Sequence, residues 1–231
     1  HLCLAARMET ARADWENAGL LGRILRILGI LWRARSLNGW KIASAMTERG
    51  KDVKVHPTAV VEFSVLGDGC DIGPHAVVRG SIIGPGAKVD SHANVNASVV
   101  DSGAKVGRFA FLNLCTVYPK AFVSSGDGFQ ASVFGRESFL AWGSTILALS
   151  FGAPVKIETD GQGSPRVDSG HHFLGAAVGH RAVVGNGVKI RYGASIPNDG
   201  MIVDSKMQLR EWGPLEIDGP AVVVDGRAAP D

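Results

Sequence analysis

Two adjacent histidines, His171 and His172, are the residues of this sequence best suited to proton transfer. The imidazole ring titrates near neutral pH, so it can accept a proton from an attacking nucleophile. Lys156 and Arg166 precede them in one stretch of chain and Arg181 follows, and these side chains could hold a phosphate group. We therefore predict that the two histidines supply the catalytic base and that the three basic residues bind the ligand. The alternative is a polar loop pair exposed to water.

The other histidines give weaker signals. His180 falls in a polar position and is predicted at the surface. His75 and His92 occupy the same position of a repeat described below, so their rings are predicted to stack. The sequence has no HxxxxH or CxxC pair, and no metal site is predicted.

Composition excludes several classes of protein. The 231 residues are 45% hydrophobic, with 24 basic and 22 acidic residues and a net charge of +2, so nucleic-acid binding is not expected. The sequence lacks an apolar run long enough to cross a membrane. The three cysteines are far apart and form no disulfide framework, which favours a reducing cytoplasm as the location.

The chain repeats itself every seventeen residues, as VHPTAVVEFSVLGDGCD (55–71) and IGPHAVVRGSIIGPGAK (72–88) show. Three positions of each repeat are large and apolar. The members are Val55, Ile72, Val89, Val106, Val123 and Leu140; Val61, Val78, Val95, Leu112, Phe129 and Ile146; and Leu66, Ile83, Val100, Val117, Phe134 and Phe151. The pattern returns at Val178, Val184, Ile190, Ile196 and Ile202.

This period predicts a solenoid with three short sides, each placing one large and one small side chain inward. Parallel hydrogen bonds would stack the coils about 4.8 Å apart, so about eight coils form a prism about 38 Å long. Like side chains then lie over one another, and each coil depends on its neighbours. The predicted organisation is a helical segment at 1–50, an all-β solenoid at 51–203 with an excursion at 152–173, and a tail at 204–231.

Residues 13–50 lack the repeat and read as helical. Leu21, Ile24, Leu25, Leu28, Leu31 and Trp32 form an apolar stripe at helical spacing. Residues 18–47 contain five basic residues and no acidic one. Two interpretations remain open: an amphipathic helix on an anionic membrane surface, or a helix that covers the open end of the prism or the trimer junction.

The repeat resembles that of hexapeptide-repeat proteins, whose fold is a left-handed parallel β-helix, over roughly residues 53–203. The segment VKIETDGQGSPRVDSGHHFLGAAVGHRAVVGNGVKI (155–190) is similar to part of the C-terminal domain of bifunctional sugar-1-phosphate nucleotidyltransferase/acetyltransferases. This resemblance implies a homotrimer with ligand sites between neighbouring prisms, and acyl-CoA as a co-substrate without a metal.

The family's acetyl transfer uses a histidine as general base, and its position falls on Ser125 or Gly126 of this chain. Its tyrosine falls on about Gly128, its asparagine on Ala148 and the arginine that grips the sugar phosphate near Asn96, whereas its lysine is kept as Lys156.

Two functions follow. One is an acyltransferase-like enzyme acting on a sugar phosphate or nucleotide sugar with an acyl-CoA donor, with His171 or His172 as a base recruited from a new position. The other is a non-catalytic trimeric scaffold or sugar-nucleotide-sensing module that has lost the acetyltransferase site.

Overall fold

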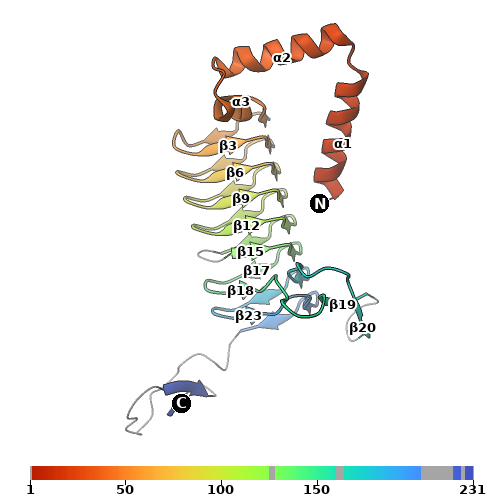
Figure 1. Ribbon diagram of the computed structural model, residues 1–231. Coiled ribbons are helices and arrows are strands. Elements are labelled where there is room, and N and C mark those ends of the chain that lie inside the picture. Colours follow the sequence, from red (N-terminus) through yellow and green to blue (C-terminus); the bar gives the residue numbers. More distant parts are fainter. Residues whose placement is uncertain (1, 125–127, 160–163, 204–220, 225–226, 231) are drawn as a thin grey trace.

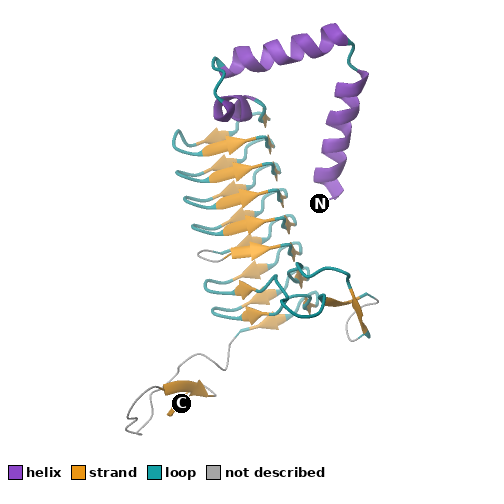
Figure 2. Ribbon diagram, in the orientation of Figure 1, coloured by secondary structure: helices purple, strands orange, loops and turns teal. Residues whose placement is uncertain are grey.

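The computed structural model describes residues 2–124, 128–159, 164–203, 221–224 and 227–230. Most of the chain forms a left-handed parallel β-helix, which three helices precede (Figure 1). The predicted all-β solenoid is confirmed, and its coils stack along one axis with the helices at one end (Figure 2).

The coils build three parallel faces. The first sheet contains β1 (Glu48–Arg49), β4 (Val65–Leu66), β7 (Ile82–Ile83), β10 (Val99–Val100), β13 (Thr116–Val117), β16 (Val133–Phe134), β21 (Ala177–Val178) and β24 (Ser195–Ile196). The second sheet contains β2 (Lys54–Val55), β5 (Asp71–Ile72), β8 (Lys88–Val89), β11 (Lys105–Val106), β14 (Phe122–Val123), β17 (Phe139–Leu140), β22 (Val183–Val184) and β25 (Met201–Ile202). The third face contains β3 (Val60–Glu62), β6 (Val77–Arg79), β9 (Asn94–Asn96), β12 (Phe111–Asn113) and β15 (Gly128–Gln130), and it continues with the pair β18 (Thr145–Ile146) and β23 (Lys189–Ile190).

The predicted columns of large apolar residues fill the inside of the tube. Val78, Ile83 and Val106, from three different columns, have no exposed surface. The prediction was wrong for Phe151, which is 94% exposed. The chain leaves the coil after β18, and the first sheet resumes only at β21, where Val178 rather than Phe151 pairs beside Phe134.

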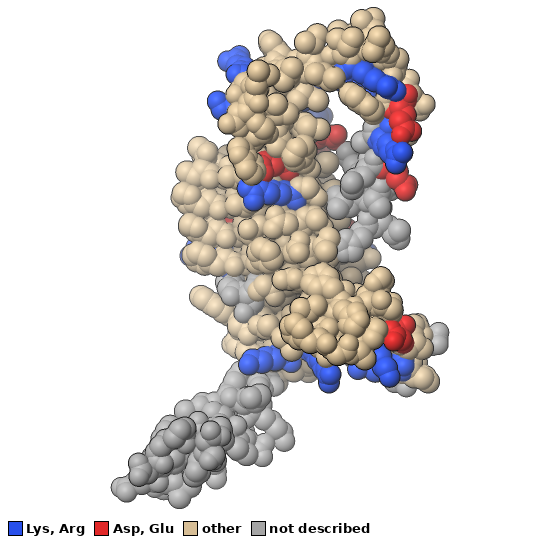
Figure 3. Space-filling model, in the orientation of Figure 1, with Lys and Arg blue, Asp and Glu red and all other residues tan. Residues whose placement is uncertain are grey.

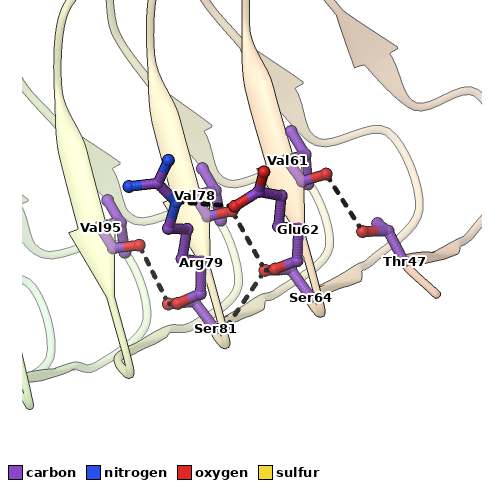
Figure 4. Close-up of polar contacts among 8 residues, drawn as sticks. All are labelled: Thr47, Val61, Glu62, Ser64, Val78, Arg79, Ser81 and Val95. Carbon is purple, nitrogen blue, oxygen red and sulfur yellow. Dashed lines mark hydrogen bonds and ion pairs between the residues drawn. The ribbon is translucent and has the colours of Figure 1, made fainter. Parts of the chain in front are cut away.

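A ladder of small polar residues runs along one inner corner. The Ser64 hydroxyl donates to the Glu62 carbonyl at 2.7 Å. It also lies 3.4 Å from the Val78 carbonyl oxygen and accepts from the Ser81 amide at 3.2 Å (Figure 4). The pattern repeats one coil on, where the Ser98 amide donates to the Ser81 hydroxyl at 3.1 Å and the Cys115 amide donates to the Ser98 hydroxyl at 3.0 Å. These bonds satisfy amides that turn away from the sheets at the corner, as buried donors require.

The corner between the first and second sheets needs a left-handed backbone. Gly69, Gly86 and Gly103 each have φ near +64°, a conformation that costs glycine little. Later coils place charged residues at this point, with positive φ at Lys120, Glu137, Arg181 and Asp199. Ion pairs there join successive coils, with Lys120 Nζ 3.9 Å from Glu137 and Arg181 Nε 2.6 Å from Asp199.

Helix α3 (Gly39–Ala45) covers the open end of the solenoid. Its Ala43 is buried and accepts a hydrogen bond from the Phe63 amide at 3.1 Å. The Arg79 guanidinium lies 5.6 Å from the centre of the Trp40 ring and bonds the buried Glu62 carboxylate at 2.7 Å (Figure 4). These contacts join α3 to the first coils.

The predicted apolar stripe lies on a different helix, α2 (Leu20–Ala34), of which no residue is buried. The open end is therefore covered by the following helix and not by this stripe, whereas the interpretation of the stripe as the cover of a trimer junction stays a prediction. Helix α1 (Leu2–Asn17) precedes α2 and runs back alongside the solenoid in Figure 1.

The excursion after β18 contains an antiparallel hairpin of β19 (Lys156–Glu158) and β20 (Arg166–Asp168), which projects from the side of the solenoid (Figure 1). Near the C-terminus β26 (Ala221–Val224) pairs with β27 (Arg227–Pro230).

Candidate anion-binding site

A pocket of about 370 Å³ lies where the excursion meets the corner between the third face and the first sheet. Its lining residues are Ser150, Gly152, Ala153, Pro154, Lys156, Arg166, Arg191 and Tyr192. Three of these carry a positive charge and none is acidic. Figure 3 shows Lys and Arg gathered along this lower part of the molecule, beside the excursion. Such a pocket favours an anionic ligand.

The hairpin is held against the corner by Arg166 and by close backbone contact. Arg166 Nη2 donates to the carbonyls of Lys156 at 2.7 Å and of Gly193 at 2.6 Å. Gly193 has φ +65°, and a Cβ there would lie 2.5 Å from the Lys156 carbonyl oxygen. Only glycine lets the Lys156 carbonyl come this close to the backbone of residue 193, so the excursion packs directly against the next coil.

Arg191 and Tyr192 form the corner side of the pocket. Arg191 Nη2 donates to the Tyr192 hydroxyl at 3.0 Å, and the guanidinium lies 4.9 Å from the ring centre. A hydrogen bond with Ser150 and the bond from Arg191 lower the pKa of Tyr192 below its ordinary value of 10.0. Both stabilise the phenolate, so the pocket supplies a cation and an ionisable hydroxyl side by side.

The predicted histidines lie next to this pocket without lining it. Both are exposed, and the carbonyls of His171 and His172 accept from the amides of Val155 at 2.8 Å and Ser150 at 2.9 Å. His172 Nδ1 lies 3.3 Å from the Ser150 carbonyl oxygen. A carbonyl only accepts, so this bond places the proton of the neutral ring on Nδ1 and leaves Nε2 with a lone pair. In that tautomer Nε2, the nitrogen away from the Ser150 carbonyl, is the one that can accept a proton.

The structure brings together Lys156 and Arg166 but places Arg181 elsewhere. Arg181 pairs with Asp199 through Nε at 2.6 Å and Nη2 at 2.8 Å, in the corner column between the first and second sheets. This pairing raises the pKa of Arg181 and lowers that of Asp199. Arg181 therefore joins coils in this structure, and its predicted ligand role has no support from the pocket.

The positions that the sequence resemblance suggested are scattered. Ser125 and Gly126 lie outside the described residues. Gly128 and Asn96 belong to strands of the third face, and the Ala148 carbonyl accepts from the Leu174 amide at 2.9 Å. Within the part of the chain that the structure describes, no three His, Cys, Asp or Glu side chains lie close enough to hold a metal. The predicted stacking of His75 and His92 is confirmed, with ring centres 4.9 Å apart.

Sequence reasoning missed Ser150, Arg191 and Tyr192 as pocket residues. Ser150 precedes the predicted excursion, and the other two lie at a corner of a later coil. The usable signal is that two residues, Arg191 and Tyr192, separate Ile190 from the corner glycine, whereas earlier coils have one residue before the left-handed Gly80 or Ala97.

Comparison with known proteins agrees with this architecture. Residues 44–131 match the family described as the GMPPB C-terminal domain. No curated protein matches the chain. It is similar to a mutant of GDP-perosamine N-acetyl transferase from Caulobacter crescentus in complex with CoA and GDP-perosamine, at 18% identity and a TM-score of 0.34, over 66% of this chain and 56% of that chain.

A UDP-N-acetylglucosamine acyltransferase from Arabidopsis is 12% identical, with a TM-score of 0.30, over 69% of this chain and 64% of that chain. The chain thus spans less than two thirds of the length of either structure, and these low scores carry no inference about activity. The repeat and the stacked three-sided coils agree with one another: the chain forms a left-handed parallel β-helix, and its first coils match the GMPPB C-terminal domain.

Proposed function

We propose that this protein is an acyltransferase that transfers an acyl group from acyl-CoA to a sugar phosphate or nucleotide sugar. The observation that carries the proposal is the pocket lined by Lys156, Arg166 and Arg191 with no acidic side chain. Both substrates of such a reaction carry phosphate, which arginine and lysine bind through charge-assisted hydrogen bonds. The sequence resemblance to acetyltransferase domains supports the same class.

The proposed base is His172. A nucleophile of the acceptor attacks the thioester carbonyl carbon, the bond from carbon to sulfur breaks, and CoA leaves as its thiol or thiolate. His172 Nε2 takes the proton that the attacking group loses, while the Ser150 carbonyl holds Nδ1 at 3.3 Å. Tyr192, whose pKa is lowered, is placed to bond the acceptor or a phosphate oxygen.

Three copies are proposed to assemble through the first sheet. From the second strand to the sixth, its outward side chains form a row of β-branched residues that is apolar except at Thr116: Val65, Ile82, Val99, Thr116 and Val133. The outward row of the second sheet is charged only over its first four strands, at Lys54, Asp71, Lys88 and Lys105, and it is apolar over the last four, at Phe122, Phe139, Val183 and Met201. A flat apolar face on a three-sided prism packs around a threefold axis. A second pocket joins Val133 to Ile157 and Glu158 of β19, so a neighbour on this face would lie beside the excursion.

The alternative is a non-catalytic trimeric scaffold or sugar-nucleotide-sensing module. It is favoured by the position of both histidine rings outside the pocket lining. Either function suits a reducing compartment such as the cytoplasm, because Cys70 and Cys115 are buried and unpaired.

A thiol-release assay with acetyl-CoA and a panel of amino-sugar phosphates and nucleotide sugars tests the proposal, with binding measured by calorimetry. His172→Ala is expected to lower kcat about a hundredfold or more with ligand affinity kept. Lys156→Ala with Arg191→Ala is expected to weaken CoA binding about tenfold or more. Arg108→Ala, a change at an arginine with 68% exposure on a distant coil, is the control.

Ligand binding without turnover across the panel would support the sensing module. Turnover unchanged in His172→Ala would exclude this residue as the base, and His171→Ala then tests its neighbour. Failure of CoA, the sugar phosphates and the nucleotide sugars to bind would contradict both the enzyme and the sensing module, and would favour the trimeric scaffold.

A further inference from the structure

Helix α2 presents an apolar face that nothing in the described chain covers. Exposed fractions are 78% for Leu20, 70% for Leu21, 60% for Leu25, 55% for Leu28 and 76% for Trp32. Monomeric soluble proteins rarely leave such a continuous apolar surface in water. The face therefore has an occupant that is absent from the isolated chain.

The distribution of side chains around α2 is that of an interfacial helix. At about 100° per residue, an arc of about 140° holds Leu20, Leu21, Ile24, Leu25, Leu28, Leu31 and Trp32, whereas Ile27 and Ile30 lie outside it. Arg23, Arg26 and Arg33 fall within about 80° of one another on the opposite side. An apolar arc this wide exceeds the narrow seam of a coiled coil. A helix with a Trp- and Leu-rich face and an Arg-rich face lies in the plane of a membrane surface.

Charge decides between a lipid surface and a second copy of the helix. Residues 18–47 contain Arg23, Arg26, Arg33, Arg35 and Lys41 and no acidic residue. Two α2 helices packed together would bring like charges close, because the nearest acidic residues in the sequence lie on α1 and one of them, Glu16, already pairs with Arg12 at 2.7 Å. A leaflet rich in anionic phospholipid supplies the missing negative charge, and each basic residue near it adds attraction.

The place of α2 in the molecule suits this role. Helix α2 lies beyond α3 at the end of the molecule and runs across the long axis of the solenoid (Figure 1). It ends at Arg35, whose left-handed φ of 48° turns the chain directly toward α3. Arg23 fixes the preceding turn through bonds to the carbonyls of Trp15 at 3.0 Å and Glu16 at 2.9 Å. The helix can therefore lie flat on a surface while the coils extend away from it.

We propose that α2 docks the protein on a membrane surface rich in anionic phospholipid, with Leu21, Leu25, Leu28 and Trp32 inserted among the headgroups. The helix lies on the bilayer and does not cross it. Its 15 residues span only about 22 Å, and among the described residues no helix has the length and apolarity to span a membrane.

Co-sedimentation of the full chain with vesicles tests the proposal. Phosphatidylcholine vesicles containing phosphatidylserine are expected to bind the protein about tenfold or more tightly than pure phosphatidylcholine vesicles, and added salt is expected to weaken that binding. Leu25→Ser with Leu28→Ser is expected to abolish binding, and Arg26→Gln with Arg33→Gln to remove the preference for anionic vesicles. Phe109→Ser and Arg108→Gln, at exposed positions of the solenoid, are the matched controls and should bind as the wild type does.

Two results would overturn the proposal. One is equal binding of wild type and the Leu25→Ser/Leu28→Ser variant, or no binding of either, to anionic vesicles. The other is a change in oligomeric state on sedimentation without lipid when these leucines are replaced, which would assign the face to a second copy of the chain. Neither result bears on the pocket of the proposed function, because α2 lies at the other end of the solenoid.

Discussion

From residue 54 to residue 146 each inward side chain lies beside one of similar kind in the next coil, whereas from residue 147 to residue 175 the chain leaves that order. The coils bury Val, Ile and Leu in columns. The excursion exposes Phe151 and surrounds a pocket with Lys156 and Arg166. The repeated coils supply the buried core, whereas the interruption brings Lys156 and Arg166 beside Arg191 of a later coil, where we propose that a ligand binds.

The largest loss of stability is expected for a change at Leu112, in one of the buried columns. It is fully buried, and Leu112→Ala is expected to lower the free energy of unfolding by about 2–5 kcal/mol through lost burial and a cavity. Leu114→Ala, two residues on and 37% exposed, is the control with the same change in size. Urea unfolding measures both. Equal losses for the two variants would mean that the interior column does not dominate stability.

Gly193 tests whether the excursion is seated on the coil. Gly193→Ala places a Cβ 2.5 Å from the Lys156 carbonyl oxygen, in addition to the strain of positive φ. It is expected to weaken CoA binding and to lower stability by about 1–3 kcal/mol. Gly170→Ala is the matched control, because Gly170 has φ +71° but its Cβ would meet nothing within 4 Å. Similar losses of CoA affinity in Gly193→Ala and Gly170→Ala would contradict the direct packing of the excursion on the coil at Gly193.

Substitutions in the ladder of small polar residues at the inner corner are expected to lower stability less than Leu112→Ala does. Ser98→Ala removes the acceptor of the Cys115 amide and is expected to cost about 1–3 kcal/mol in unfolding experiments. Ser98→Cys should cost less, because Cys115 already occupies the equivalent place and its thiol contacts the Phe129 carbonyl at 3.2 Å. If the alanine variant is as stable as the wild type, the ladder is not a source of stability.

The smallest expected effect is a change in the pKa of Tyr192. The pKa of Tyr192 in the folded protein lies below its ordinary value of 10.0, so folding favours the phenolate. The resulting contribution to the free energy of unfolding is present above pH 10.0 and is lost as the pH falls through the folded pKa. Arg191→Ala is expected to raise this pKa, because one of the bonds that stabilise the phenolate is removed. Tyrosinate absorbance, with Tyr192→Phe to identify the signal, measures the change. An unchanged titration would show that Arg191 does not bond the phenol in solution.

The same division explains what the sequence could predict. The period of seventeen fixes which residues face inward, and the burial of Ile83, Val106 and Leu140 follows from it. The period also produced the error at Phe151, because it carries no information about where the chain leaves the coil. Arg191 and Tyr192 were missed because a corner residue becomes part of a pocket only through a hairpin that returns from 27 residues away, as the Arg166–Gly193 bond records.

The sequence did not identify which helix covers the open end of the solenoid, for a similar reason. Helical spacing identified the apolar stripe of α2, but it did not identify its partner. The buried contact on the first coil is made by Ala43 of α3, a small residue without a strong pattern.

A crystal structure with CoA bound tests the central claim most directly, since it locates the ligand against named side chains. The account predicts phosphate oxygens within hydrogen-bonding distance of Lys156 and Arg191, in a pocket beside the first sheet of a neighbouring copy. CoA bound on another face, or a pocket that stays empty at saturating CoA, would contradict it.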